Sequence, residues 1–459
     1  MYNPALHFHF TGIGGSGMSG LAEILLGLGF RVSGSDLSLN QNCIRLQQLG
    51  AKIFKGHAAS NLDSSTSLVV YSSAVPASNP ELEEARERGL PLVRRAEVLA
   101  ELMRLKYGVA VAGSHGKTTT TSMVAAILEA AKLDPTVIIG GLVHSIGSGG
   151  KLGKGDFLVA ESDESDRSFL LLKPSIAVVT NIDTEHLGAY GSVADLEHAF
   201  EQFVSAVPFY GLAVLCVDDP RVRDLSMRYR GRKVSYGLSP DAQIRATNLA
   251  HNGPRSSFDL ERDGHAALRV ELPFPGRHLV QNSLAAIAVG LELSIDPATI
   301  VEALHHFGGV GRRLELAGSA RGITVINDYG HHPTEIRATI EAVRSGWVSQ
   351  AGRLHVVFQP HRFSRTRDCF SDFLGSFAGA DSVRIAPIYP AGEAPIPGVD
   401  AEALCNALRV PENRAYLHDL NEAIPDLQSR ARAGDVVLFL GAGSVGALPE
   451  QFLRELSHA

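Results

Sequence analysis

Short runs of apolar residues alternate along this chain with longer segments in which apolar residues recur at helical spacing. Residues 109–112 form one such run, bounded by glycine, and we predict a strand there. Residues 123–131 repeat apolar side chains at the spacing of a helix. Further runs typical of buried strands occur in SLVVYSSAVP, GDFLVAESDESD, IAVVTNIDTEHL, GITVINDYG, RLHVVFQPH and DVVLFLGAGSVG. Strands separated by helical stretches predict an α/β fold.

The length of 459 residues exceeds what one hydrophobic core usually organises, so about three domains are expected. The charged helix AEVLAELMRL closes a first segment, and the glycine-rich link FGGVGRRLELAG opens the last one. We predict a Rossmann-like domain at 1–106, a central domain at 107–310 with a sheet like that of phosphate-loop ATPases, and a second Rossmann-like domain at 311–459.

Composition narrows the class of protein. The four cysteines are far apart and form no CxxC pair, so neither a disulfide framework nor a zinc site is suggested. We find no signal peptide and no apolar run of the ~18 residues that a membrane span needs, and we expect a cytoplasmic protein. A formal net charge of −7 argues against a nucleic-acid binder, whose footprint would be a basic patch.

The segment GSHGKTTTT between the predicted strand at 109–112 and the following helix has the character of a phosphate-binding loop. Gly113 and Gly116 let backbone N–H groups close on an anion, Lys117 can reach terminal phosphates, and the Thr118 hydroxyl can bind Mg²⁺. The alternative is a capped helix start with a solvated lysine. Only two residues separate the glycines, where the usual spacing has four, so the loop is of a shorter type.

A second glycine-rich turn lies near the N-terminus, in HFHFTGIGGSGMSGLAE. Gly12, Gly14 and Gly17 form GxGxxG after a predicted strand and before a predicted helix. Asp36 closes the next strand at the spacing where such folds place an acid near a ribose hydroxyl. This pattern favours a nucleotide or dinucleotide site over a tight turn without a ligand.

Acidic and polar residues follow two strands of the central segment. The first group could bind Mg²⁺ beside the phosphate loop or form a solvated acidic turn; it consists of Glu161, Asp163, Glu164 and Asp166. The second group follows the next strand and is expected at the same edge of the sheet, as a set of ligands or as structural residues: Asn181, Asp183 and His186.

Basic residues mark the last segment. Arg312 and Arg313 lie in its glycine-rich link. In FQPHRFSRTRD, Arg362 and Arg365 are three positions apart and can converge on one anion beside His361, although a solvated basic face is the alternative.

Three anion sites in one chain predict an ATP-driven joining enzyme, because a phosphate loop with nearby carboxylates supports phosphoryl transfer and two further ligands must meet the γ-phosphate. A dehydrogenase would use the N-terminal glycines and leave the phosphate loop without a role. A non-catalytic ATP-dependent sensor would bind nucleotide without turnover that depends on an acceptor.

The chain resembles the Mur ligases of peptidoglycan synthesis over nearly its whole length. The resemblance is carried, in order, by HFTGIGGSGMSGLAE, GSHGKTTTT, ESDESD, TNIDTEHL, PFYGLAVLCVDDP, PGRH, GVGRRLE, NDYGHHPTEI, QPHRFSRTRD and YPAGEAPIPG. It implies a cytoplasmic enzyme, monomeric or homodimeric, that uses ATP and Mg²⁺ to join L-alanine to UDP-N-acetylmuramate through an acyl phosphate. QPHRFSRTRD favours this member of the family over the one that reattaches a recycled murein tripeptide to the same sugar nucleotide.

The resemblance also implies roles for individual residues. Those expected to bind the UDP-sugar are Gly14, Gly15, Ser16, Met18, Ser35 and Asp36. Those expected at ATP are Gly113, Ser114, His115, Gly116, Lys117, Thr118, Thr119, His278, Asn282, Arg313 and Asp328. The expected metal ligands are Thr118, Glu161 and His186, and the expected catalytic group is Lys117, Glu161, His186 and Arg313. On the amino-acid and muramyl side we expect Tyr329, His331, His361, Arg362 and Arg365.

Three positions depart from the family pattern, and to one of them, Asn327 in place of an aspartate, we attach no mechanistic role. Leu279 stands where a polar residue often lies near the adenine. Several Mur ligases carry a carbamylated lysine shortly after the metal-binding histidine; the matching position here is Phe200, and no lysine occurs between Lys173 and Lys233. A phenyl ring cannot ligate a hard cation.

Overall fold

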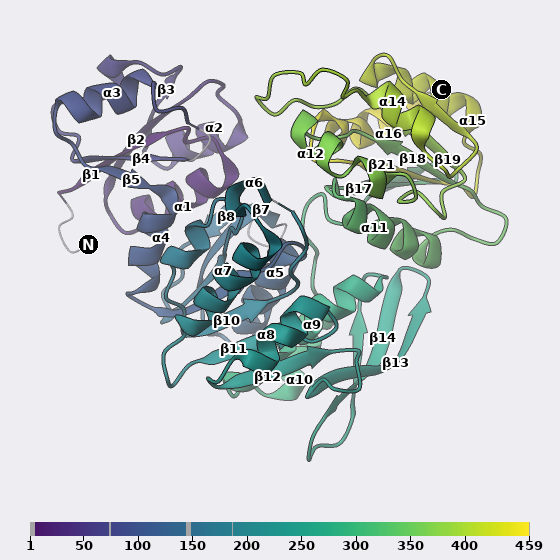
Figure 1. Cartoon of the computed structure of the whole chain (residues 1–459), viewed down its shortest axis with the longest axis horizontal. Helices are drawn as coiled ribbons and strands as arrows, with labels where there is room; N and C mark the ends of the chain where they lie inside the picture. The colour runs from purple at the N-terminus through teal and green to yellow at the C-terminus, as the bar shows by residue number, and fades with distance from the viewer. Residues whose placement is uncertain (1–4, 73–74, 144–147, 186, 459) are drawn as a thin grey trace. The chain divides into compact units, whose positions relative to one another are not determined.

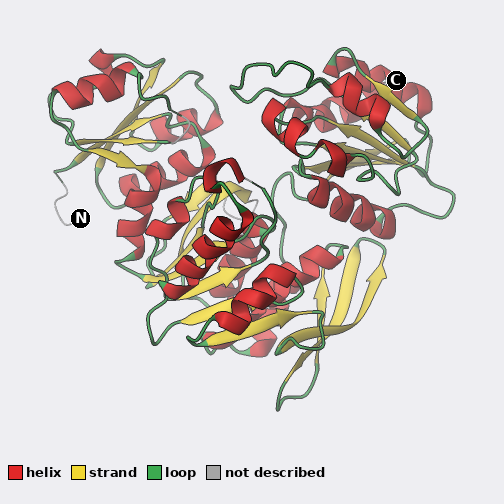
Figure 2. Cartoon of the chain, viewed as in Figure 1, coloured by secondary structure: helices red, strands yellow, loops and turns green. Residues whose placement is uncertain are grey.

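The computed structural model describes residues 5–72, 75–143, 148–185 and 187–458 (Figure 1). Its helices and strands form three separate sheets with flanking helices (Figure 2), which confirms the predicted α/β class with three parts. By backbone contacts the chain divides into two compact units. The first comprises 1–247, 259–270 and 281–308, and the second 248–258, 271–280 and 309–459.

The N-terminal sheet has the order β3-β2-β1-β4-β5, and all its strands are parallel. This is the strand order of a Rossmann-like unit, as predicted. Its strands are β1 (His7–Thr11), β2 (Arg31–Asp36), β3 (Lys52–Lys55), β4 (Leu68–Tyr71) and β5 (Leu92–Arg94). Its helices are α1 (Ser16–Gly27), α2 (Gln41–Gln48), α3 (Pro80–Glu87) and α4 (Arg95–Met103). Local sequence fixes two helix starts, because the side chains of Asn40 and Asn79 cap α2 and α3.

The central sheet has the order β15-β14-β13-β12-β11-β10-β6-β9-β7-β8. Strand β6 (Tyr107–Ala112) lies between the parallel strands β9 (Phe157–Glu161) and β10 (Ile176–Val179), so all three end at one edge. The other strands are β7 (Thr136–Val143), β8 (Ser148–Lys151), β11 (Leu212–Cys216), β12 (Lys233–Gly237), β13 (Ile244–Asn252), β14 (Arg255–Arg262) and β15 (Leu268–Leu272). The helices are α5 (Lys117–Ala130), α6 (Leu187–Tyr190), α7 (Val193–Ser205), α8 (Pro220–Arg228), α9 (Arg277–Glu292) and α10 (Pro297–His305).

Helix α5 begins at Lys117, earlier than the predicted start at residue 123. Apolar periodicity could not reveal this first part of the helix, because it is built of threonines and a serine. In the structure the hydroxyls of Thr121 and Ser122 donate to the carbonyls of Lys117 and Thr118, one turn earlier. The polar segment is therefore helical, and its N-terminus opens directly onto the phosphate-loop turn.

The C-terminal sheet has the order β16-β17-β21-β18-β19-β20. It is parallel except for β16 (Glu315–Ala320), which pairs antiparallel with β17 (Ile323–Asp328). The predicted link FGGVGRRLELAG therefore runs into an edge strand, which the glycine-rich composition concealed. The other strands are β18 (Leu354–Phe358), β19 (Ser382–Ile385), β20 (Arg414–Tyr416) and β21 (Val436–Leu440). The helices are α11 (Pro333–Gly346), α12 (Phe363–Asp368), α13 (Phe370–Phe373), α14 (Ala401–Ala407), α15 (Ala423–Arg430) and α16 (Leu448–His458).

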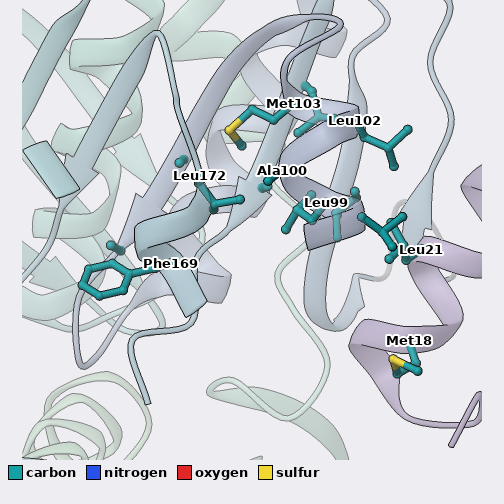
Figure 3. Close-up of a cluster of buried hydrophobic side chains, with 14 of the residues drawn as sticks. Met18, Leu21, Leu99, Ala100, Leu102, Met103, Phe169 and Leu172 are labelled. Carbon is teal, nitrogen blue, oxygen red and sulfur yellow. The ribbon is translucent and has the colours of Figure 1, made fainter. Parts of the chain in front are cut away.

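One hydrophobic core joins the N-terminal helices to the central sheet. Figure 3 labels the following members of this cluster: Met18 and Leu21 of α1; Leu99, Ala100, Leu102 and Met103 of α4; and Phe169 with Leu172. Each fully buried side chain of this size contributes about 2 kcal/mol through removal from water. The glycine turn that precedes α1 is therefore held by a helix that packs in the hydrophobic core. In the part of the chain that the structure describes, no helix has the length and apolar character needed to cross a membrane.

Candidate active site

The phosphate-loop turn, Gly113 to Gly116, connects β6 to α5. Its two glycines have φ of +135° and +80°. A Cβ atom on Gly113 would lie 2.0 Å from Thr180 Oγ1, and one on Gly116 would lie 2.5 Å from Asn282 Oδ1. Only glycine fits at either position. The turn thus brings the free N–H groups of the first turn of α5 to the edge of the sheet, where they can bind an anion.

Residues after β10 hold this turn in place. The His115 N–H donates to Asn181 Oδ1 over 2.8 Å, and Asn181 Nδ2 donates back to the His115 carbonyl over 3.0 Å. His115 Nε2 lies 3.0 Å from Asp183 Oδ2, and the Asp183 N–H donates to the Ser114 hydroxyl. Asn181 and Asp183 thus support the phosphate loop. His186, the third residue of that predicted group, lies outside the described residues.

Lys117 is held by three acceptors. Its Nζ donates to the carbonyls of Gly113 and Ser114 over 2.7 and 3.1 Å, and lies 2.8 Å from Glu164 Oε2. Burial alone would lower the pKa of Lys117, but Glu164, Asp163 and Glu161 together raise it above its ordinary value. The lysine is therefore a preorganised positive charge at the mouth of the loop.

The four carboxylates at the end of β9 and directly after it have different surroundings. Glu161 accepts from the Thr118 hydroxyl over 3.0 Å and from the Gly140 N–H over 2.8 Å, whereas Glu164 pairs with Lys117. Asp163 and Asp166 accept from main-chain N–H groups two residues further on, so each closes its own turn. Glu161 is thus hydrogen-bonded to Thr118, which was also predicted as a metal ligand. A carboxylate beside a hydroxyl is an oxygen donor set that fits Mg²⁺.

The N-terminal glycine turn is tied to Asp36. The Gly14 N–H donates to Asp36 Oδ2 over 2.9 Å, and the side chains of Asn40 and Asn42 donate to the Gly14 carbonyl. Gly12 has φ of +82°, which suits glycine. Asp36 and the turn therefore form one element at the carboxyl end of β1 and β2, where open α/β sheets bind ligands.

Two residues predicted to bind the UDP-sugar have inward-facing side chains. Met18 of α1 is buried in the hydrophobic core that the N-terminal helices share with the central sheet. The Ser35 hydroxyl is fully buried and donates to Glu81. Neither side chain is available to a ligand in this arrangement. Gly15 lies at the start of α1, and the side chain of Ser16 is not among those described.

Helix α9 carries two of the residues predicted at ATP, His278 and Asn282. Asn282 is buried beside Gly116 in the first unit. In the second unit, burial lowers the pKa of His278 to about 4, with Glu335 opposing and Arg313 adding to the effect. Leu279 packs in the hydrophobic core of that unit, which explains an apolar residue at this position.

The predicted residues of the C-terminal part gather at the ends of β17 and β18. Arg313 lies over the Tyr329 ring at 4.8 Å from its centroid, and the His331 ring lies against Tyr329 and His361 at 5.4 and 5.5 Å. Arg365 NH1 lies 3.3 Å from His361 Nδ1. The structure thus brings together residues that are distant in the sequence, as the predicted substrate pocket requires.

Burial keeps His331 and His361 neutral, because it lowers the pKa of both. Burial lowers the pKa of His361 to about 4, and the charges of Arg365 and Arg362 add to the effect. Burial also places the pKa of His331 well below its ordinary value, against the opposing charge of Glu335. The positive charge at this site therefore comes from the arginines, which suits an anionic ligand such as a carboxylate.

Asp328, which was predicted to bind ATP, is the last residue of β17 and is buried. Its carboxylate accepts from the Leu314 N–H over 2.7 Å, the Gly330 N–H over 2.8 Å and the Thr339 hydroxyl over 3.1 Å. Burial raises its pKa. These contacts fix the turn that carries Arg313, so the side chain supports the site from within the protein.

Sequence reasoning missed several residues of these sites. Glu335 accepts from the His331 N–H and lies 3.7 Å from Arg313 NH1, and the Tyr389 ring stacks on His361 at 5.6 Å. Glu335 and Tyr389 occur in segments that carried the family resemblance, NDYGHHPTEI and YPAGEAPIPG. That resemblance was the signal in the sequence that could have identified them. Glu81 and His57, which lie beneath the N-terminal glycine turn, gave none.

The fold and the loop define a nucleotide-binding protein of the phosphate-loop class, built from three α/β parts. The chain belongs to the Mur ligase family, whose members are ATP-dependent ligases. Residues 7–107 match the model of the Mur ligase family, catalytic domain; residues 111–290 match the Mur ligase middle domain; and residues 312–443 match the Mur ligase, glutamate ligase domain.

Relatives share about half of the sequence. The chain is 51% identical over 461 residues to a UDP-N-acetylmuramate--L-alanine ligase of Geobacter sp. (strain M21), covering 100% of this chain and 99% of the relative. It is 51% identical to the enzyme of that name from Desulfatibacillum aliphaticivorans, with both chains fully covered. Among solved structures, it resembles a UDP-N-acetylmuramate-alanine ligase from Thermotoga maritima with a TM-score of 0.83, 29% identity and 99% coverage of both chains.

Proposed function

We propose that this protein uses ATP to join L-alanine to UDP-N-acetylmuramate in the synthesis of peptidoglycan precursors. The observation that carries this proposal is the phosphate loop, in which Lys117 is aligned by two loop carbonyls while the Thr118–Glu161 pair lies beside it. Relatives that carry the name of this activity are half identical to the chain over its full length, which supports the choice of substrates.

In this mechanism the lactyl carboxylate of UDP-N-acetylmuramate attacks the γ-phosphorus of ATP, and ADP leaves. The amine of L-alanine then attacks the acyl phosphate, and the tetrahedral intermediate collapses to the amide and phosphate. Lys117 stabilises the negative charge that develops on the transferred group. To do so its ammonium group exchanges one of its present three acceptors for a phosphate oxygen, and Glu164 is the acceptor that lies outside the loop.

The other residues bind and position the substrates. Asp36 and the glycine turn receive the sugar nucleotide, and Tyr329, His331, His361, Arg362 and Arg365 form the amino-acid and muramyl side. Arg313 and Asn282 contribute to ATP binding. Thr118 and Glu161 would hold a Mg²⁺ ion, with His186 as a ligand of a second one; when bound, the metal supplies positive charge that offsets the phosphate oxygens.

Phosphate release tests the proposal. The purified protein is supplied with ATP, Mg²⁺ and UDP-N-acetylmuramate, and then with L-alanine, glycine, L-serine or the tripeptide L-alanyl-γ-D-glutamyl-meso-diaminopimelate. We expect release that depends on L-alanine and on the sugar nucleotide. With ¹⁸O in the muramyl carboxylate, one labelled oxygen should appear in phosphate. Phosphate release that depends on the tripeptide and not on L-alanine would refute the proposal and indicate the tripeptide ligase reaction instead.

The tripeptide reaction is the second candidate. A UDP-N-acetylmuramate:L-alanyl-γ-D-glutamyl-meso-diaminopimelate ligase from Neisseria meningitides is 30% identical, with a TM-score of 0.62 over 67% of this chain and 99% of that chain. The higher identity of the alanine-ligase relatives over the full length favours L-alanine.

A further inference from the structure

A fully buried carboxylate lies beneath the N-terminal ligand edge. Glu81, in the first turn of α3, has no exposed surface. Its Oε2 accepts from the hydroxyls of Thr11 and Ser35 over 2.8 and 2.7 Å, and its Oε1 accepts from Asn61 Nδ2 over 2.7 Å. His9 Nε2 lies 3.3 Å from Oε2. Three hydrogen-bond donors, Thr11 of β1, Ser35 of β2 and Asn61, therefore converge on one side chain, and His9 of β1 lies beside them.

This carboxylate stays ionised. Burial by itself would raise the pKa of Glu81, but hydrogen bonds and charge from His9, together with the bonds from Asn61 and Ser35, lower it to about 2. An ionised carboxylate has no proton to donate and acts only as an acceptor. The direction of every hydrogen bond to Glu81 is thereby fixed.

The Ser35 hydroxyl determines which nitrogen of His57 carries the proton. The Ser35 hydroxyl has one proton, and that proton is directed at Glu81. Toward His57 Nδ1, which lies 2.8 Å from Ser35 Oγ, the hydroxyl oxygen can therefore only accept. Neutral His57 must then carry its proton on Nδ1, which leaves a lone pair on Nε2.

The hydrogen bonds that connect Glu81, Ser35 and His57 form a relay, and this relay ends at the ligand edge of the sheet. Thr11 and Ser35 are the residues directly before Gly12 and Asp36, which begin the two elements of the predicted sugar-nucleotide site. The His57 side chain retains 15% of its exposure, and among the described residues its Nε2 forms no hydrogen bond. His57 Nε2 is thus left as a hydrogen-bond acceptor for a ligand.

We propose that Glu81 is a positioning residue of the sugar-nucleotide site, which acts through Ser35 to fix His57 as a hydrogen-bond acceptor for an N–H or O–H group of the uridine moiety. This inference rests on the proposed function for the identity of the ligand. It assigns a functional part to three side chains that form one chain of hydrogen bonds, Glu81, Ser35 and His57.

The substitution Glu81→Gln tests the relay because it reverses the polarity. Asn61 Nδ2, which also donates to the Gly56 carbonyl, keeps the amide oxygen of the variant at the Oε1 position. The amide nitrogen then takes the Oε2 position and donates to Ser35, whose own proton turns to His57 Nδ1 and forces the His57 proton onto Nε2. We expect the KM for UDP-N-acetylmuramate to rise about tenfold or more, with kcat and the KM for ATP within twofold of wild type. Glu83→Gln, the same change at an exposed position of the same helix, is the control and should leave all constants unchanged.

A double substitution separates the relay from simple packing. In a Ser35→Ala background the connection is cut, so adding Glu81→Gln should produce less than a twofold further change in the KM for UDP-N-acetylmuramate. Two effects that multiply in the double variant, or a KM for ATP that rises in parallel, would mean that Glu81 only stabilises the fold and would overturn the inference.

Spectroscopy and ligand binding on the wild-type protein test the relay even if a variant fails to fold. The ¹⁵N shifts of the wild-type imidazole should show His57 protonated on Nδ1; protonation on Nε2 overturns the inference. Calorimetry with UDP, 3-methyl-UDP and 2′-deoxy-UDP, without ATP or L-alanine, identifies which group of the uridine donates. One analogue should bind to the wild-type protein about tenfold more weakly than UDP does. To the Glu81→Gln variant, that analogue and UDP should bind with equal affinity. If neither analogue is discriminated, the inference fails. Absence of alanine-dependent turnover in the wild type would instead refute the proposed function.

Discussion

Replacing Lys117 with methionine should separate the chemistry of the phosphate loop from its stability. The side chain of Lys117 bonds to two loop carbonyls and to Glu164, which is buried. Loss of one charge on the transferring phosphoryl group costs roughly 3 kcal/mol of transition-state stabilisation. We therefore expect phosphate release to fall by more than about 100-fold.

The same substitution leaves Glu164 buried without its partner. Breaking a buried ion pair from one side typically costs about 3 kcal/mol or more, so the variant should melt at a lower temperature than wild type. The double variant Lys117→Met/Glu164→Gln removes the unpaired charge and should recover most of the thermal stability while remaining inactive. Lys151→Met is the matched control: Lys151 pairs with the partly exposed Glu129, and its loss should cost less than about 1 kcal/mol.

The pH dependence has a defined sign. Burial raises the pKa of Glu164 from its ordinary 4.5 to about 7, against the opposing charge of Lys117. A carboxyl whose pKa is raised on folding lowers stability as the pH rises through that range. Without Lys117 the pKa rises further, so Lys117→Met should be most destabilised above pH 7 and approach wild type near pH 5. Activity within threefold of wild type, or a double variant no more stable than Lys117→Met, would refute this account.

Three further outcomes are expected. Asp36→Ala should raise the KM for UDP-N-acetylmuramate far more than that for ATP, because Asp36 holds the Gly14 N–H; a change confined to ATP would show that the first domain is misassigned. Gly113→Ala should abolish ATP binding in calorimetry, since its Cβ would lie 2.0 Å from a neighbouring oxygen, whereas Gly29→Ala, with positive φ but open space, should keep it. Turnover should be the same in degassed and bicarbonate-supplemented buffer, because Phe200 is fully buried and offers no carbamate oxygen; bicarbonate activation would contradict this.

Much of the fold followed from local patterns. The strand at 109–112 and the three C-terminal strands are present, because buried parallel strands require continuous apolar runs. The polar first turns of α5 and the edge strand β16 were missed: threonines in the first case and glycines in the second conceal elements that tertiary contacts complete. Local patterns therefore determine interior elements better than edges and termini.

The phosphate loop was determined by the sequence alone, since its glycines, lysine and threonine act within a single turn of backbone. Only the tertiary structure separated Glu161 from Glu164, which are three positions apart but have Thr118 and Lys117 as their respective partners. The same holds for the Ser35 hydroxyl, which faces a glutamate 46 positions away. The direction of a side chain and the partner that satisfies it depend on which strands lie side by side, and that arrangement is decided by packing over the whole sheet.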